Sequence, residues 1–240
     1  IIQTVQDDGK YNQHAVGFEG EHIYKVDHKI ADKLEEFSKL LFKGTLRHSY
    51  PHSWRSKAPL IYRNTPQWFI SMEKNNLRDI ALKSIDETIF YPPQGQTRLR
   101  SMIETRPDWC VSRQRVWGVP LPLFVNKKTG QPLRDENIIN RIADIYEKEG
   151  SNTWFTEDPQ RFLGDEYSLE DYEQVKDVVE VWFDSGSTHA FCLEQREDLK
   201  WPASMYLEGS DQHRGWFHSS LLESSGTRGK APYESVLTHG

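Results

Sequence analysis

Two carboxylates and a carboxamide lie close together just after the apolar run Met205–Leu207. The segment reads Glu208, Gly209, Ser210, Asp211, Gln212. The apolar run is typical of a strand, and residues 212–223 have the spacing of a helix that Ser210 or Asp211 would cap. Ligands of open α/β sheets bind beyond the carboxyl ends of strands, and a helix N-terminus there favours an anion. This turn is therefore predicted to be a small-molecule site; the alternative is that Asp211 only caps the helix and nothing binds.

Two further strand-like runs also end in polar residues. Residues 179–183 read as a buried strand that ends in the turn Asp184-Ser185-Gly186-Ser187, and residues 233–237 lead into Thr238-His239-Gly240. Helical segments separate the three runs, which together predict a doubly wound half-sheet of parallel strands. Neighbouring strands of such a sheet would bring the three polar turns to one crevice.

Arginine and tryptophan alternate in residues 106–122. The segment contains Arg106, Trp109, Arg113, Arg115 and Trp117. Arginines near aromatic rings can contact phosphates and stack on bases. The alternative is that they form ion pairs with local carboxylates such as Asp108. The stretch 108–112 itself reads as the start of a strand.

Two histidines and two serines have a spacing that suggests a metal site. They are His48, His52, Ser53 and Ser56. Serine is a poor zinc ligand, so a metal is not expected here. Instead, the histidines and Trp54 are expected to pack across a β-ribbon over residues 48–72, with strands at residues 60–63 and 68–71.

Apolar residues three or four positions apart predict four further helices. These are residues 25–42, which Gly44 would end, and residues 77–85, 96–104 and 136–148. Residues 123–178 read as an insertion, with a hairpin around the turn Lys128-Thr129-Gly130 and an acidic loop after the last helix. Residues 1–47 read as the end of a small α/β unit.

Composition limits the function classes. The 240 residues carry a net charge of −6, so any contact with nucleic acid would need a local basic patch. Cys110 and Cys192 stand far apart, which indicates a reducing compartment and argues against a disulfide framework or a four-thiolate zinc site. No apolar run is long enough to span a membrane. The chain lacks an initiator methionine, and we expect it to be a piece of a longer protein.

Five motifs, in order, give the sequence a family resemblance. They are TPQWFISM, RPDWCVSRQRVWGVPLP, VWFDSGS, YLEGSDQHRGWF and VLTHG. Together they resemble the class I aminoacyl-tRNA synthetases of the bacterial isoleucyl type, least clearly in residues 123–178. The resemblance implies an α/β fold in which residues 73–240 belong to the second half of the Rossmann-type catalytic domain. Residues 48–72 would return to that domain as a β-ribbon, and residues 1–47 would be the tail of the inserted editing domain.

The resemblance also implies a function for the full-length protein. It would activate isoleucine with ATP and Mg²⁺, transfer it from isoleucyl-adenylate to tRNA(Ile), and edit misactivated valine. Contacts with the adenylate and the amino group are implied for Glu208, Gly209, Asp211, Gln212, His239 and Gly240. Trp182 and Trp216 would form the walls of the isoleucine side-chain pocket, because flat apolar rings suit a branched alkyl group. Basic residues that would contact tRNA or have a structural role are Arg106, Arg113 and Arg115. The protein is expected to be a cytoplasmic monomer, without zinc in this segment.

Two family motifs do not occur in these residues. HIGH and KMSKS bind the ATP phosphates in the family and stabilise developing charge, and the 240 residues contain neither. We therefore assign no catalytic residue in this chain, and we expect that the chain has no activity by itself. Two other hypotheses are a non-catalytic binding module built on a synthetase core and a valyl or other branched-chain synthetase.

Overall fold

The computed structural model describes residues 2–240, so Ile1 lies outside the described residues. The chain divides into two compact units, one that ends at Pro66 and one that spans Gln67–Gly240. Within residues 2–240, no helix has the length and apolar character needed to cross a membrane. The boundary falls inside the segment 48–72, which the sequence suggested to be one ribbon.

The N-terminal unit has little regular structure. It contains the short 3₁₀-helix η1 (Ile23–Lys25) and helix α1 (Asp27–Glu36). The helix predicted over residues 25–42 is therefore too long: the backbone turns at Ser38, where φ is 54°, and Gly44 does not end the helix. The apolar side chains of α1 are not buried, so tertiary packing does not stabilise a longer helix.

The strand predicted over residues 60–63 is also wrong, because these residues form no regular strand. A single isolated bridge joins His52 to Pro59. Tyr50 lies edge-on to His48 and His52, with ring centroids 6.0 and 6.1 Å away. The histidines therefore pack against a tyrosine within a short loop rather than across a ribbon.

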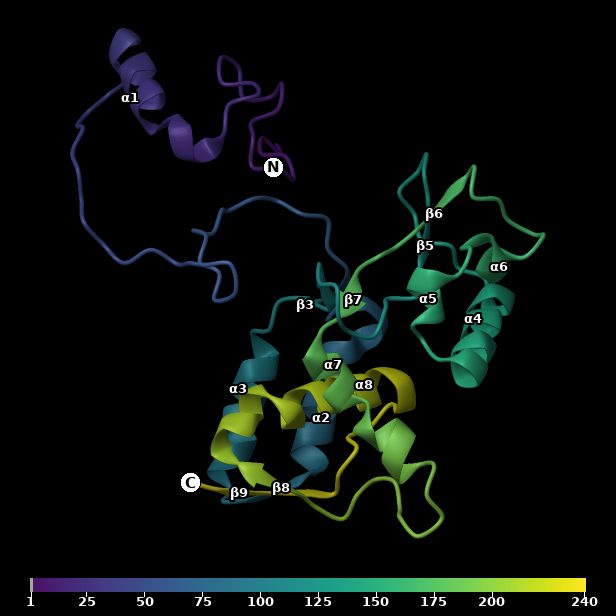
Figure 1. Cartoon of the computed structure of the whole chain (residues 1–240). Coiled ribbons are helices and arrows are strands. Elements are labelled where there is room, and N and C mark those ends of the chain that lie inside the picture. The colour runs from purple at the N-terminus through teal and green to yellow at the C-terminus, as the bar shows by residue number, and fades with distance from the viewer. Residues whose placement is uncertain (1) are drawn as a thin grey trace. The chain divides into compact units, whose positions relative to one another are not determined.

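The C-terminal unit holds most of the helices and strands (Figure 1). Its α-helices are α2 (Leu77–Glu87), α3 (Gln94–Glu104), α4 (Glu136–Glu149), α5 (Thr153–Thr156), α6 (Gln160–Leu163), α7 (Val181–Gly186) and α8 (Trp216–Arg228). Its strands are β1 (Phe69–Ile70), β2 (Ile89–Tyr91), β3 (Trp109–Cys110), β4 (Ser112–Arg113), β5 (Phe124–Asn126), β6 (Tyr172–Gln174), β7 (Val178–Val179), β8 (Tyr206–Gly209) and β9 (Ser235–His239). Three shorter helices are η2 (Lys74–Asn76), the π-helix η3 (His189–Leu193) and η4 (Ser210–Arg214). The helices predicted at residues 77–85, 96–104 and 136–148 are confirmed by α2, α3 and α4.

A three-stranded parallel sheet carries the predicted polar turn. Its strand order is β2, β9, β8, and both pairings are parallel. β8 and β9 confirm the strands predicted at residues 205–207 and 233–237, with shifts of one or two residues. The third strand is β2, which the sequence analysis did not predict.

The strand predicted over residues 179–183 is wrong. Only Val178 and Val179 are extended, in β7, which pairs antiparallel with β4 and lies outside the parallel sheet. Helix α7 follows at once, so the D-S-G-S motif ends a helix instead of a strand. A short apolar run is compatible with either element, and tertiary packing decided for the helix.

The sheet and helices α2, α3 and α8 share one hydrophobic core. Ile85, Leu99, Leu221 and Val236 are completely buried in it. α8 is buried over most of its surface, from Phe217 to Ser225. This packing fixes α8 against the sheet and thereby positions the residues just before its first turn.

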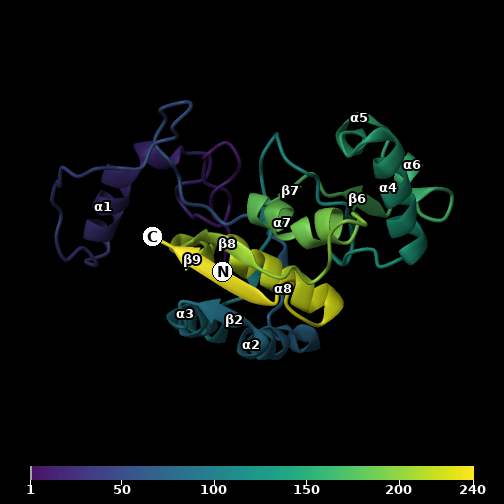
Figure 2. The ribbon, with the colours of Figure 1, turned by 90° about the horizontal axis from the view of Figure 1, so that it is seen from below.

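Residues 124–174 form a lobe with a second core, and Figures 1 and 2 both show α4, α5 and α6 grouped apart from α2, α3 and α8. Trp154 and Phe162 are fully buried there, with ring centroids 4.9 Å apart. The predicted hairpin around residues 128–130 is present, because Val125 bridges Pro132 antiparallel across the turn. β5 also pairs with the distant strand β6. The predicted acidic loop contains α5 and α6 instead.

Candidate functional site

The carboxyl ends of β8 and β9 bring two of the predicted polar segments together. Gly209 pairs with His239, and Glu208 pairs with Thr238. The Glu208 carboxylate accepts a hydrogen bond from the backbone N–H of Gly209 (2.9 Å) and is exposed. Gly240 follows directly, so these residues occupy one edge of the sheet, where ligands of parallel sheets bind.

Gln212 joins this edge to helix α8. The predicted continuous helix over residues 212–223 is interrupted at Gly215, where φ is −123° and ψ is −117°. Across this break, Gln212 Oε1 accepts a hydrogen bond from the backbone N–H of Trp216 (2.9 Å). Its Nε2 lies 3.2 Å from Asp211 Oδ2 and donates to it. Gln212 therefore caps the helix, and the prediction that Ser210 or Asp211 does so is wrong.

The two tryptophans of the implied side-chain pocket come from adjoining helices. Trp216 stacks on Tyr206 with a centroid distance of 4.0 Å and an angle of 6°. Its Nε1 donates to the backbone oxygen of Ser185 in α7 (3.1 Å). The Trp182 ring, also from α7, lies against Gly215, where an added Cβ would come within 3.0 Å of it. The structure thus places both indoles beside the break before α8.

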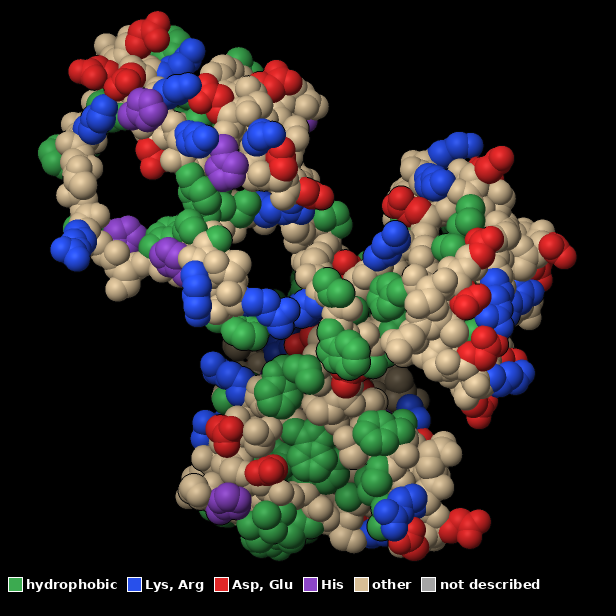
Figure 3. All heavy atoms as spheres, viewed as in Figure 1, with side chains coloured by type: hydrophobic (Ala, Val, Ile, Leu, Met, Phe, Trp, Pro, Cys, Tyr) green, Lys and Arg blue, Asp and Glu red, His purple; other side chains and the backbone are tan. Residues whose placement is uncertain are grey.

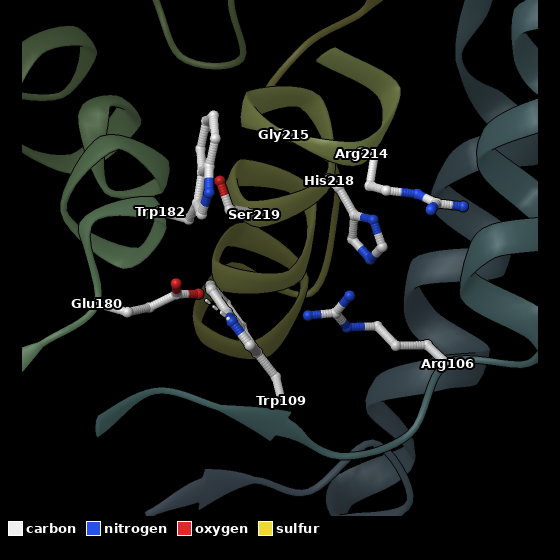
Figure 4. A pocket seen from close by; sticks show the side chains of 8 residues that line it. All are labelled: Arg106, Trp109, Glu180, Trp182, Arg214, Gly215, His218 and Ser219. Carbon is white, nitrogen blue, oxygen red and sulfur yellow. Dashed lines mark hydrogen bonds between the residues drawn. The ribbon is translucent and has the colours of Figure 1, made fainter. Parts of the chain in front are cut away.

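A small cavity of about 50 Å³ opens beside Trp182. In Figure 4, Trp182 and Ser219 lie on one side of it, with His218, Arg106 and Arg214 on the other. His218 is buried, and burial together with the two arginines lowers its pKa to about 3. The ring is therefore neutral at ordinary pH.

Glu180 anchors the start of α7, and the sequence analysis did not select it. Its carboxylate accepts hydrogen bonds from Trp109 Nε1 and from Arg113 Nη2, the second at 2.9 Å (Figure 4 shows the first). Its backbone N–H donates to the oxygen of Val111 (2.8 Å). The sequence did contain a signal for this role: Glu180 is the one charged residue in the apolar run 178–183, and a buried charge needs polar partners.

Arg106 and Arg113 have different surroundings. The Arg106 guanidinium lies over the Trp109 ring, 5.6 Å from its centroid, and burial lowers its pKa. Arg113 pairs with Glu180. The alternative pairing of these arginines with Asp108 does not occur; one oxygen of that carboxylate accepts the backbone N–H of Met72 (2.9 Å).

Arg115 differs from both, because its side chain has no ion-pair or hydrogen-bond partner within residues 2–240. It lines a separate groove together with Trp117 and Trp182. The three arginines that alternate with tryptophan in the sequence therefore divide into one structural ion pair, one stacked guanidinium and one free cation.

Glu223 is a second buried acid that the sequence analysis missed. It lies on α8 next to Gly186, where an added Cβ would overlap its carboxylate. Burial, with smaller contributions from Asp184 and Glu180, raises its pKa to about 9. The glycine of the D-S-G-S motif thus makes room for a protonated carboxyl group between α7 and α8. Within residues 2–240, no three His, Cys, Asp or Glu side chains lie close enough to hold a metal ion.

The sequence of this chain matches one protein family and several curated proteins. Residues 6–240 match the family model described as tRNA synthetases class I (I, L, M and V). The isoleucine–tRNA ligase of Pelagibacter ubique (strain HTCC1062) is 68% identical over 239 residues, which is 100% of this chain and 26% of the relative. Those of Brucella abortus (biovar 1, strain 9-941) and Zymomonas mobilis are 56% and 53% identical over 98% and 100% of the chain. The chain spans about a quarter of the length of these curated relatives. It therefore belongs to the class I tRNA synthetases of the I, L, M and V group.

Proposed function

We propose that this chain supplies the part of an isoleucine–tRNA ligase that binds isoleucine and its adenylate. The observation that supports this best is the hydrogen bond between Gln212 and the backbone of Trp216. It joins a carboxylate-bearing turn to an aromatic ring. A branched amino acid needs both parts, a polar group for its ammonium and a flat apolar wall for its side chain.

In this proposal, Glu208 and Asp211 receive the amino group and the ribose hydroxyls of isoleucyl-adenylate. Both are exposed acids at the carboxyl edge of the sheet. Gly209 and His239 lie side by side at that edge, and together with Gly240 they would border the nucleotide. Trp182 and Trp216 would enclose the isoleucine side chain.

The full-length ligase would carry out two steps. The isoleucine carboxylate attacks the α-phosphate of ATP, so that pyrophosphate leaves and isoleucyl-adenylate forms. A ribose hydroxyl of tRNA(Ile) then attacks the acyl carbon and AMP leaves. Mg²⁺ would enter bound to the ATP phosphates, as is usual at such sites. We expect this chemistry to take place in the cytoplasm, in a monomeric protein.

An apolar pocket discriminates weakly against valine. A missing methylene is worth about 1–3 kcal/mol, a general value that comes from isoleucyl-tRNA synthetase itself and not from this structure. This supports a second, hydrolytic site for valine in the full-length protein. We assign residues 1–47 to the tail of that editing insertion, residues 48–72 to the return segment, and residues 73–240 to part of a Rossmann-type catalytic domain. The parallel sheet β2–β9–β8 with α2, α3 and α8 supports the last assignment.

Calorimetric titration with a non-hydrolysable isoleucyl-adenylate analogue tests the proposal, with the valyl analogue for comparison. We expect the isoleucyl form to bind about tenfold more tightly or better. Asp211→Asn should weaken both ligands. Asp198→Asn is the matched control, because that exposed acid forms an ion pair with Arg196, two residues earlier. Equal affinity for the two analogues, or no binding by a protein with native circular dichroism, would contradict the proposal.

A further inference from the structure

A cavity of about 400 Å³ lies between the C-terminal half of α8 and the segment formed by α7 and η3. It shares no lining residue with the small cavity beside Trp182. The backbone of Gly186 packs against Ser219, which lines the small cavity, and against Glu223, which lines the larger one. The two cavities are therefore separate sites along the same pair of helices. Figure 3 shows hydrophobic side chains gathered on the face of this unit over these helices, α7 and α8.

Apolar side chains form most of the walls of the larger cavity. They are Ile70, Leu77, Phe183, Ala190 and Leu222. The volume falls in the range of small-molecule sites. Phe183 contributes an aromatic ring, and pairs of aromatic rings gain more free energy than their buried area alone provides. The walls therefore suit an uncharged aromatic ring.

Three of the five polar side chains that line this cavity already have partners. The hydroxyls of Ser187 and Thr227 donate to backbone oxygens three and four residues earlier (2.8 and 2.5 Å). Arg228 donates to both carboxylate oxygens of Glu194 (2.9 and 2.7 Å), which neutralise it. These three side chains therefore need no ligand, and the arginine offers no free charge to one.

The other two polar side chains are His189 and Glu223, which are 1% and 9% exposed. His189 Nε2 and Glu223 Oε1 are buried and have no hydrogen-bond partner among residues 2–240. Buried polar atoms in folded proteins are nearly always hydrogen-bonded. Two such atoms, on side chains that line one apolar cavity, therefore indicate a binding site.

The protonation of both side chains follows from their surroundings. His189 Nδ1 lies 3.0 Å from the backbone oxygen of Gly186, which can only accept, so Nδ1 carries the proton. Burial lowers the pKa of His189, so at neutral pH the ring is uncharged and Nε2 is an acceptor. Burial raises the pKa of Glu223 to about 9, so its carboxyl group keeps its proton and can donate. The cavity therefore offers one acceptor and one donor.

We propose that this cavity binds a neutral aromatic alcohol of the phenol class. The ring lies among the apolar side chains, the hydroxyl donates to His189 Nε2, and its oxygen accepts from the Glu223 carboxyl group. A hydroxyl donates and accepts at once, so one group satisfies both side chains. An anion fits poorly, because a carboxylate has no proton to donate to His189 and Arg228 is already paired. This site lies outside the proposed isoleucine site and does not depend on that function.

Fluorine NMR of the full-length protein tests the class of ligand with three probes of similar shape. They are 4-fluorophenol, 4-fluorotoluene, which lacks the hydroxyl, and 4-fluorobenzoate, which is an anion. We expect 4-fluorophenol to bind about fivefold more tightly than 4-fluorotoluene, because two hydrogen bonds are added, and 4-fluorobenzoate not to bind. Equal affinity for any two of the probes, or no binding of 4-fluorophenol, would overturn the proposal.

Competition distinguishes this cavity from the proposed isoleucine site, whose aromatic walls could also hold a phenol. An excess of the isoleucyl-adenylate analogue should leave 4-fluorophenol bound, because the two cavities share no lining residue. Displacement by the analogue would place the probe at the isoleucine site and overturn the proposal.

Variants of the two polar side chains test the hydrogen bonds. His189→Asn keeps a donor for Gly186 and removes Nε2, so it should weaken 4-fluorophenol binding about fivefold. Glu223→Gln keeps an uncharged group that donates and accepts, and should preserve binding, whereas Glu223→Met should weaken it. The controls are His28→Asn, an exposed histidine of α1, and Glu234→Gln, an exposed acid paired with Lys200.

A filling variant tests the cavity without touching these side chains. Gly226 lines the cavity, and an added Cβ would meet Leu77 at 3.5 Å, so the leucine of Gly226→Leu would occupy the cavity. We expect this variant to lose 4-fluorophenol binding while it keeps native circular dichroism and binds the isoleucyl-adenylate analogue as the wild type does. Unchanged 4-fluorophenol binding by both Gly226→Leu and His189→Asn would overturn the site, and so would an equal loss in the control variants.

Discussion

The carboxylate of Glu180 accepts a hydrogen bond from the indole of Trp109, which precedes it by 71 residues. Both side chains are buried. Arg113 adds a second contact to the same carboxylate (2.9 Å). The first turn of α7, and with it Trp182, is thereby tied to strands β3 and β4.

Glu180→Ala should lower the free energy of unfolding by about 1–3 kcal/mol, because it leaves the buried Trp109 N–H without an acceptor. Glu180→Gln keeps an acceptor and should cost less. Urea denaturation measures both. Glu149→Gln is the matched control: its ion pair with Arg161 is exposed and should change stability by less than about 1 kcal/mol. If Glu180→Ala is as stable as this control, Glu180 does not anchor α7.

Gly215→Ala should displace Trp182. The added Cβ would lie 3.0 Å from the Trp182 ring and closer still to the Gln212 side chain. We expect affinity for the isoleucyl-adenylate analogue to fall about tenfold or more, measured by calorimetric titration. Gly226→Ala, within the helix α8 that Gly215 precedes, is the control, because the nearest atom to its Cβ would be a methyl carbon of Leu77 at 3.5 Å. That change should leave binding intact and favour the helix by up to about 1 kcal/mol.

Trp216→Ala in the full-length enzyme should raise the KM for isoleucine, because we propose that the ring forms a wall of the isoleucine pocket. The ring also stacks on Tyr206, so Trp216→Phe serves as a variant that preserves more of the packing. Isoleucine-dependent ATP–pyrophosphate exchange measures KM and kcat separately. An unchanged KM in Trp216→Ala would remove this residue from the pocket.

Glu223 should make the protein less stable as the pH rises. Its pKa is about 9 when folded, against an ordinary value of 4.5, so the folded state holds a proton that the unfolded state releases. The stabilising contribution is complete below about pH 4.5 and is lost as the pH rises through 9. Its slope is at most about 1.4 kcal/mol per pH unit. Unfolding free energies from pH 5 to 9 should fall more steeply for the wild type than for Glu223→Gln; parallel curves would show that Glu223 is ionised in the folded protein.

The sequence by itself determined the elements whose apolar residues repeat over several turns. α2, α3 and α4 were predicted for this reason, because a long run of the helical period fits no other element. The sequence also predicted the polar turn after β8 and the polar segment at the end of β9. The family resemblance rested on five motifs in a fixed order. Their order can be read from the sequence whichever helix or strand each motif forms.

Only the tertiary structure decided how the short elements form and pair. Residues 181–186 form a helix whose start is held by hydrogen bonds from Trp109 and Arg113, more than sixty residues away, to the Glu180 carboxylate. β2 became a strand because β9 lies beside it. Position 215 has no room for a side chain because the Trp182 ring of the preceding helix α7 lies against it. In each case contacts between residues distant in the sequence contribute more than the local preference of a few residues, and such contacts leave no periodic pattern to read.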